Sequence, residues 1–234
     1  MRALALVLVI FAARYFFVPP LWLRPPLPPA VRALLQGPAA DAARELAPNL
    51  YAQHRGWLLV HIAGGSIAMM LGLVQFIASV RSARPAVHRA LGTIYLGVVV
   101  LASVAGFRIA LAMPAAVPAD VRSRFMPVTI AFLALSVVWL TVTIAAYRRA
   151  RQRRFDEHRA WMIRSYSLTF AAVTTRLLAP VFLFLFDDPV TGTTAGLLTW
   201  PLNLVVAEWL IRRSGEPVPA APRAAWPPRS AAPH

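Results

Sequence analysis

The chain has 234 residues, of which 59% are hydrophobic and 14% are charged, and its mean hydropathy is +0.60. This composition is too apolar for an ordinary soluble domain and predicts a membrane protein. The formal net charge of +15 comes from 24 basic residues, all arginine, against nine acidic ones. The arginines lie between apolar segments and form no single patch, which argues against nucleic-acid binding. The chain has no cysteine, which excludes disulfides, thiolate metal sites and iron–sulfur clusters.

Apolar runs long enough to cross about 30 Å of hydrocarbon predict an all-α, polytopic integral membrane bundle of about six transmembrane helices. The first span lies in residues 1–18. It is short and contains Arg14, and we interpret it as an uncleaved anchor because no small-x-small cleavage site follows it; a signal peptide is the alternative. The other five predicted spans are residues 57–79, 90–112, 125–147, 160–186 and 193–211.

The segments outside these spans have their own composition. Residues 19–56 are rich in proline and predict an external segment that caps the bundle, with a short surface helix over residues 38–47. Residues 57–211 form the predicted five-helix membrane domain. Residues 212–234 are rich in alanine and proline and predict a disordered cytoplasmic tail, because such a segment buries too little apolar surface to offset its ordering entropy.

The distribution of arginine predicts the orientation of the chain. Fourteen arginines flank the predicted spans on one side, six flank them on the other, and four lie within spans. Since arginine and lysine near span ends remain in the cytoplasm, the side with fourteen is predicted to be cytoplasmic. We therefore expect a multi-pass protein of the bacterial cytoplasmic (inner) membrane with both termini in the cytoplasm.

Small and polar residues recur at helical spacing on four of the predicted spans. Because helices in lipid associate through small residues and interhelical hydrogen bonds, these faces predict the packing seams of a four-helix core made by spans two to five. The seams are, in chain order, His61, Gly65, Ala68, Gly72, Gln75 and Ser79; His88, Gly92, Tyr95, Val99, Ala102 and Gly106; Thr129, Phe132, Ser136, Trp139 and Thr143; and His158, Ser165, Thr169, Ala172 and Arg176.

Two similar segments, residues 87–91 and 157–161, begin the third and fifth spans with a shared His-Arg-Ala sequence. They suggest a duplicated hairpin that places His88 and His158 at one depth. Two imidazoles on facing helices are the ligands of a b-type haem, so we predict that these histidines hold haem iron. The predicted partners of the haem propionates are Arg89, Arg159 and Arg164.

Two other interpretations of these His-Arg pairs remain open. Each pair could anchor a helix end among the lipid headgroups. Each could also bind an anion, such as an anionic lipid headgroup, at a helix N-terminus, where free N–H groups and the helix dipole favour negative charge.

A second constellation lies toward the opposite face. His61, Arg108 and Arg176 are expected at similar depths and predict a site for a substrate or anion, with a quinone carbonyl as one candidate. An arginine near the middle of the membrane costs about 2.5 to 3.5 kcal/mol on insertion scales, so Arg176 needs a compensating partner. Arg108 lies nearer its helix end, where it could instead extend to the headgroups.

The sequence resembles domain-of-unknown-function family 2306, a family of bacterial membrane proteins, over most of residues 57–186. The residues that carry the resemblance are His61, Gly64, Gly65, Gly72, Gln75, Phe76, Arg84, Pro85, His88, Arg89, Gly92, Tyr95, the segment 158–166 and Arg176. The resemblance implies a helical membrane fold and no particular activity. His88 with Gly92 is also similar to a ligand helix of the b561-type membrane cytochromes, although the outer side lacks a second histidine pair.

These observations favour a membrane redox protein that binds one haem b and exchanges electrons with a quinone or small reductant near His61 and Arg176. The alternative is a non-catalytic binding or transport protein for an anionic lipid or small anion, and a purely structural subunit is a third possibility. No HExxH pair, nucleophile elbow, phosphate loop or carboxylate dyad occurs in the sequence, so an enzymatic activity stays undecided. The lipid bilayer is the expected partner in every case, and the sequence leaves the oligomeric state open.

Overall fold

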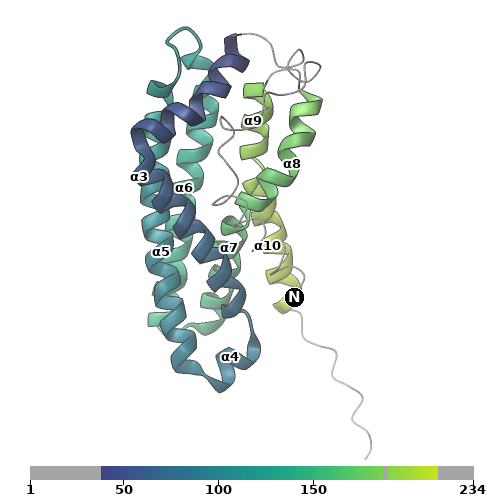
Figure 1. Cartoon of the computed structure of the whole chain (residues 1–234). Coiled ribbons are helices and arrows are strands. Elements are labelled where there is room, and N and C mark those ends of the chain that lie inside the picture. Colours follow the sequence, from purple (N-terminus) through teal and green to yellow (C-terminus); the bar gives the residue numbers. More distant parts are fainter. Residues whose placement is uncertain (1–37, 187–188, 216–234) are drawn as a thin grey trace, which may run out of the picture.

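A computed structural model describes residues 38–186 and 189–215, and these residues form a bundle of helices without strands (Figure 1). The all-α class predicted from the sequence is therefore confirmed. The predicted first span and most of the predicted tail lie outside the described residues. The elements are α3 (Pro38–Gln75), α4 (Ala78–Ala83), α5 (Pro85–Ala112), the 3-10 helix η2 (Met113–Ala116), α6 (Arg122–Arg151), α7 (Phe155–Thr169), α8 (Ala171–Leu185), α9 (Pro189–Leu197) and α10 (Trp200–Gly215).

Four helical segments in the described part of the chain are long and apolar enough to cross a membrane. They are Ala52–Gln75, Pro85–Ala116, Arg122–Arg151 and Thr194–Arg213. These segments correspond to the predicted second, third, fourth and sixth spans. Large apolar side chains on their outer faces are exposed, among them Leu101, Ile130 and Val205. Such a surface is unfavourable in water and suits contact with acyl chains, as expected for a membrane protein.

The second half of the predicted proline-rich segment, including the predicted short helix over residues 38–47, lies within helix α3. Helix α3 begins at Pro38 and runs into the span, with one non-helical residue, His54 (φ −129°, ψ 27°), where it bends. The prolines of this segment lie mainly before residue 39, and only Pro48 follows. Residues 39–56 therefore contain one proline, whereas residues 19–38 contain seven, and most of the later stretch can form a helix.

The predicted fifth span, residues 160–186, is two helices instead of one. Helices α7 and α8 meet at Phe170, where the chain bends (Figure 1). Two threonine hydroxyls flank the bend: Thr169 donates to the carbonyl of Ser165 at 3.0 Å, and the one hydrogen of Thr174 is shared between the carbonyl of Phe170, at 3.3 Å, and Asn203 Oδ1, at 3.0 Å. Hydroxyls that bond the carbonyl four residues earlier compete with the helical ladder and bend helices, which explains the break.

The predicted sixth span is also interrupted, between α9 and α10 at residues 198–199. Pro201 has no backbone N–H to continue the ladder, and it occupies the first turn of α10, where that donor is not needed. The hydroxyl of Thr199 donates to the carbonyl of Gly196 at 2.7 Å and closes the end of α9. The second interruption therefore also has a local cause in the sequence.

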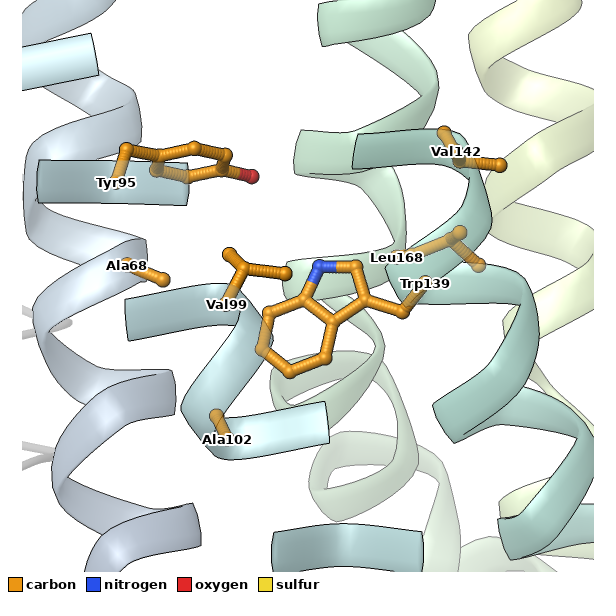
Figure 2. Close-up of a cluster of buried hydrophobic side chains, with 7 residues drawn as sticks. All are labelled: Ala68, Tyr95, Val99, Ala102, Trp139, Val142 and Leu168. Atoms are coloured by element: carbon orange, nitrogen blue, oxygen red, sulfur yellow. The ribbon is translucent and has the colours of Figure 1, made fainter. Parts of the chain in front are cut away.

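The core lies where α3, α5, α6 and α7 meet, as predicted for spans two to five. Figure 2 shows its buried apolar cluster, to which every one of these four helices contributes. The cluster consists of Ala68, Tyr95, Val99, Ala102, Trp139, Val142 and Leu168. Trp200 and Leu204 of α10 pack against it from the side of α7.

The predicted seams match the buried faces of α5 and α6 and fail in part on α3 and on the fifth predicted span. The prediction for α3 extends too far, since α3 ends at Gln75 and Ser79 is exposed in α4. On the fifth predicted span Ser165 and Thr169 are buried, whereas Ala172 is exposed. The bend at Phe170 turns the rest of that stripe away from the core.

Two glycines of α3 allow neighbouring helices to approach closely. A Cβ atom on Gly64 would lie 3.0 Å from the Cβ of Ala102, and one on Gly72 would lie 2.3 Å from the ring of Tyr166. The predicted contact glycine Gly65 has no atom within 4 Å of its Cβ position, so Gly64 takes its place in the seam. Gly72 holds α7 against α3, because it makes room for the Tyr166 ring.

We predict that Gly72→Ala lowers the stability of the bundle by about 1 to 3 kcal/mol, because the added methyl group displaces the Tyr166 ring from a packed site. Thermal unfolding of the purified protein in detergent measures the change. Gly65→Ala on the same helix is the control and should unfold near the wild-type temperature. Equal unfolding temperatures of the two variants would contradict the assigned packing.

Candidate functional site

A network of buried hydroxyl groups joins α5, α6 and α7 in the middle of the core. The Tyr95 hydroxyl lies 2.9 Å from Ser165 Oγ and 3.1 Å from Thr169 Oγ1. The Trp139 indole N–H donates to Thr169 Oγ1 at 3.0 Å, and Thr143 Oγ1 lies 2.7 Å from Ser165 Oγ. All five side chains are buried.

Every hydrogen of this network has an acceptor in one arrangement. Thr143 donates to the carbonyl of Trp139 at 2.8 Å, and Thr169 to the carbonyl of Ser165. Ser165 then donates to Thr143, and Tyr95 to Ser165 or Thr169. Because a polar group without a partner is costly in the membrane interior, the network fixes the relative positions of the three helices.

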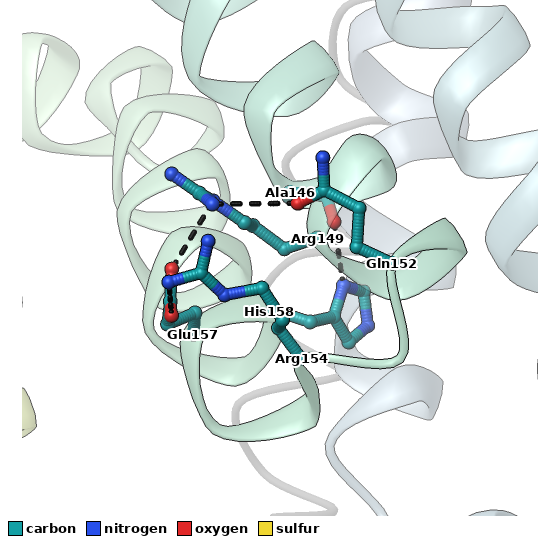
Figure 3. Close-up of polar contacts among 6 residues, drawn as sticks. All are labelled: Ala146, Arg149, Gln152, Arg154, Glu157 and His158. Carbon is teal, nitrogen blue, oxygen red and sulfur yellow. Dashed lines mark hydrogen bonds and ion pairs between the residues drawn. The ribbon is translucent and has the colours of Figure 1, made fainter.

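One end of the bundle carries most of the arginines in the described residues, and we call it the arginine-rich end; it contains α4, the α6–α7 turn and the end of α10. In the α6–α7 turn Glu157 pairs with Arg154 and, at 3.2 Å, with Arg149 (Figure 3). Arg153 adopts a left-handed backbone conformation (φ 60°), which reverses the chain between the two helices. This short turn sets the position of the first residues of α7.

His158 is oriented by a backbone group of the neighbouring helix. Its Nδ1 lies 2.8 Å from the carbonyl oxygen of Ala146 on α6 (Figure 3). A carbonyl can only accept, so Nδ1 carries the hydrogen and Nε2 is left as the basic nitrogen of a neutral ring. This tautomer, fixed by a backbone carbonyl, is the usual arrangement of a metal-binding histidine.

His88 lies in the first turns of α5, near the arginine-rich end. Its Nδ1 is buried and has no hydrogen-bond partner among the described residues. Gln75 of α3 donates to the His88 carbonyl at 3.1 Å and holds this part of α5 in place.

The two histidines also share a register. His88 precedes Tyr95 by seven residues, and His158 precedes Ser165 by seven. Seven residues are two helical turns, or about 10.5 Å. Since Tyr95 and Ser165 are in direct contact, the histidines lie on the facing sides of α5 and α7, both two turns nearer the arginine-rich end.

The three arginines predicted to bind propionates have different surroundings. Arg89 and Arg159 are exposed next to the histidines. Arg164 instead forms a two-pronged ion pair with Glu208 of α10, with distances of 2.5 Å and 3.0 Å, and lies over the ring of Trp161. Sequence reasoning missed this pair, because no local signal connects residues that are 44 positions apart.

The predicted site of His61, Arg108 and Arg176 is not brought together as one site among the described side chains. His61 points into the bundle, where its Nδ1 lies 2.9 Å from the carbonyl of Ala102 and its ring packs edge-on against Phe132. Arg108 is exposed and lies over the ring of Trp57. Arg176 belongs to α8, but its side chain lies outside the described part of the structure.

The structure adds a polar cluster that the sequence analysis did not single out, at the two helix interruptions. Thr174 lies 3.0 Å from Asn203 Oδ1, and Thr175 lies 3.2 Å from Thr199 Oγ1. These contacts tie α8 to α9 and α10. In the sequence, only the threonines near residue 174 indicated such a cluster, because a single straight span gives them no common role. Within the described residues, no three His, Cys, Asp or Glu side chains gather as a metal site.

The fold and its apolar surface define a multi-pass helical membrane protein. The chain belongs to the family described as Predicted membrane protein (DUF2306), whose sequence pattern matches residues 58–211. No curated protein and no solved structure matches the chain significantly. The similarity to b561-type cytochromes gains no support from these comparisons.

We predict that Thr143→Val destabilises the protein by about 1 kcal/mol, because it leaves the buried Ser165 hydroxyl without its acceptor. The unfolding temperature in detergent measures this loss. Thr141→Val is the matched control on α6: its hydroxyl is exposed and bonds only within its own helix. An equal effect of both substitutions would mean that the network contributes nothing beyond local helix propensity.

Proposed function

We propose that this protein is a membrane redox protein that binds one b-type haem between His88 and His158. The proposal includes its orientation: the arginine-rich end lies in the cytoplasm of a bacterial inner membrane, in agreement with the positive-inside rule. The electron partner is a quinone or a small reductant.

The observation that supports the proposal best is the matched register of the two histidines. Each precedes one residue of the Tyr95–Ser165 contact by seven positions, or about two helical turns, and this register supports a facing arrangement on α5 and α7. A six-coordinate haem requires two imidazoles at one depth on different helices. The matched register of His88 and His158 supports this arrangement.

The surroundings of each ring fit a ligand role. The Ala146 carbonyl fixes the His158 tautomer, so that a basic Nε2 is available. The buried His88 Nδ1 without a partner among the described residues is a polar atom that a ligand would satisfy. Bound haem would supply one-electron chemistry. Arg89 and Arg159 would neutralise its propionates, while Arg164 stays paired with Glu208.

We predict that protein purified from haem-replete cells shows an α band after dithionite reduction, and that His88→Ala or His158→Ala removes it, because each change deletes one axial ligand. Absorption spectra of membranes and of purified protein measure the band. His54→Asn, at the bend of α3 and away from α7, is the control and should keep the wild-type spectrum.

Size-exclusion profiles of the variants establish that a lost band does not reflect misfolding. A colourless wild-type preparation would refute the proposal. So would histidine variants that are folded and retain the full band.

A second function, the binding of an anionic lipid, is favoured by a groove on α6. The groove has a volume of about 430 Å³ and lies on the last two turns of α6 and the following turn. Its lining combines apolar and basic groups: Thr141, Ile144, Ala145, Arg148, Arg149 and Gln152. An acyl chain fits the apolar part and a phosphate the exposed Arg148, while Arg149 is already paired with Glu157.

We predict that Arg148→Gln lowers the affinity for phosphatidylglycerol about five-fold, because one exposed charge near an anionic surface contributes about 1 kcal/mol. Native mass spectrometry of the detergent-solubilised protein with added phosphatidylglycerol measures the bound fraction. Arg151→Gln, an exposed arginine outside the groove, is the control. Equal losses in the two variants would indicate only general attraction to the arginine-rich end.

A further inference from the structure

The two helix interruptions lie side by side at one level of the bundle. Phe170 follows His158 by twelve residues, and Trp200 precedes Arg212 by twelve, so each is about 18 Å from the arginine-rich end. The Thr174–Asn203 and Thr175–Thr199 contacts hold the two interrupted segments together. In membrane proteins, interrupted helices near the middle of the bilayer are tolerated where they are buried or line a binding site.

Two hydrogen-bond donors at this level are not used by the described part of the protein. They are Trp200 Nε1 and Asn203 Nδ2, and both atoms are buried without a partner among the described residues. The residues are three positions apart, so they lie on one face of α10. Trp200 packs on the core cluster that includes Leu168, before the bend, and Asn203 bonds Thr174, after it. The two donors therefore face the bend at Phe170.

The chemistry of these atoms restricts what they can bind. An indole N–H only donates, and the amide oxygen of Asn203 already accepts from Thr174, so the free positions are both donors. Their partner must therefore supply acceptor oxygens. It must also be apolar enough to reach the middle of the membrane, which excludes charged substrates.

We propose that Trp200 and Asn203 bind a carbonyl oxygen of a lipid-soluble quinone at the bend between α7 and α8. Ester carbonyls of phospholipids stay near the headgroups, whereas these donors lie about 14 to 18 Å inward from the arginine-rich end. The indole of Trp200 packs against the buried apolar cluster of the core, and an aromatic ring suits contact with a flat quinone ring. This proposal names the electron partner of the proposed function and rests on that function for its redox role. The binding itself does not depend on haem.

The site differs from the one that the sequence analysis favoured. His61 lies across the bundle on α3, where its Nδ1 is used by the Ala102 carbonyl. Arg176 follows Thr175 on α8 and so belongs to the interrupted segment itself. The proposed quinone site therefore lies at the contact between α8 and α10, and not beside His61 on α3.

The test is a calorimetric titration of the full-length protein in detergent with ubiquinone-1. We expect Trp200→Phe, which keeps the ring and removes only the N–H donor, to weaken binding at least ten-fold. Asn203→Leu should weaken it as much. Trp209→Phe is the matched control, because Trp209 is exposed on the same helix and its ring stacks with Arg213; this variant should bind like the wild type.

A second titration separates a quinone from a phospholipid carbonyl as the source of the acceptor. Excess dioleoylphosphatidylcholine should not displace ubiquinone-1; displacement would overturn the assignment. Wild-type affinity in Trp200→Phe, or no binding by the wild type, would also overturn it. Should Asn203→Leu fail to fold, Trp200→Phe alone decides.

The outcome is independent of the haem test. Colourless protein that binds ubiquinone-1 in a Trp200-dependent manner refutes the haem and supports the quinone site. Protein with the α band but with ubiquinone-1 binding that is absent or insensitive to Trp200→Phe supports the haem and refutes this site.

Discussion

The structure depends on one constraint: a polar group inside the membrane must find its partner within the protein. The Tyr95 hydroxyl meets this constraint by contacting both Ser165 and Thr169. Its position on α5 then fixes the rotation and the height of α7, because a shift of one residue would break both contacts. The contacts of this hydroxyl therefore also set the relative heights of His88 and His158, which lie two turns away.

The same constraint explains why the two helix interruptions occur together. Each bend frees backbone and side-chain groups, and neither could face lipid without a cost. Thr174 and Thr175 of α8 are satisfied by Asn203 and Thr199 on the other interrupted segment. The two weak points thus stabilise each other. Two buried donors near these interruptions, Trp200 Nε1 and Asn203 Nδ2, have no partner among the described residues.

The sequence predicted those parts of the fold that follow from periodicity within one helix. The stripe from Tyr95 to Gly106 gave the buried face of α5, because the helix is straight and its neighbours are close. The stripe on the fifth span failed beyond Thr169, since a bend of local origin changes the rotation of everything that follows. Long-range pairs such as Arg164 with Glu208 had no signal at all, because they arise only when α7 and α10 are packed together.

The candidate site was predictable in part for the same reason. The shared His-Arg-Ala sequence placed His88 and His158 near one depth, but it did not indicate how each ring is held. In the structure His61 and His158 both donate from Nδ1 to a carbonyl of a neighbouring helix. Such a bond alone gives a histidine a structural role. His88 differs, because its buried Nδ1 has no such carbonyl among the described residues. The carbonyl bonds therefore explain how His61 and His158 are held, and nothing in the sequence indicated that His88 would be held differently.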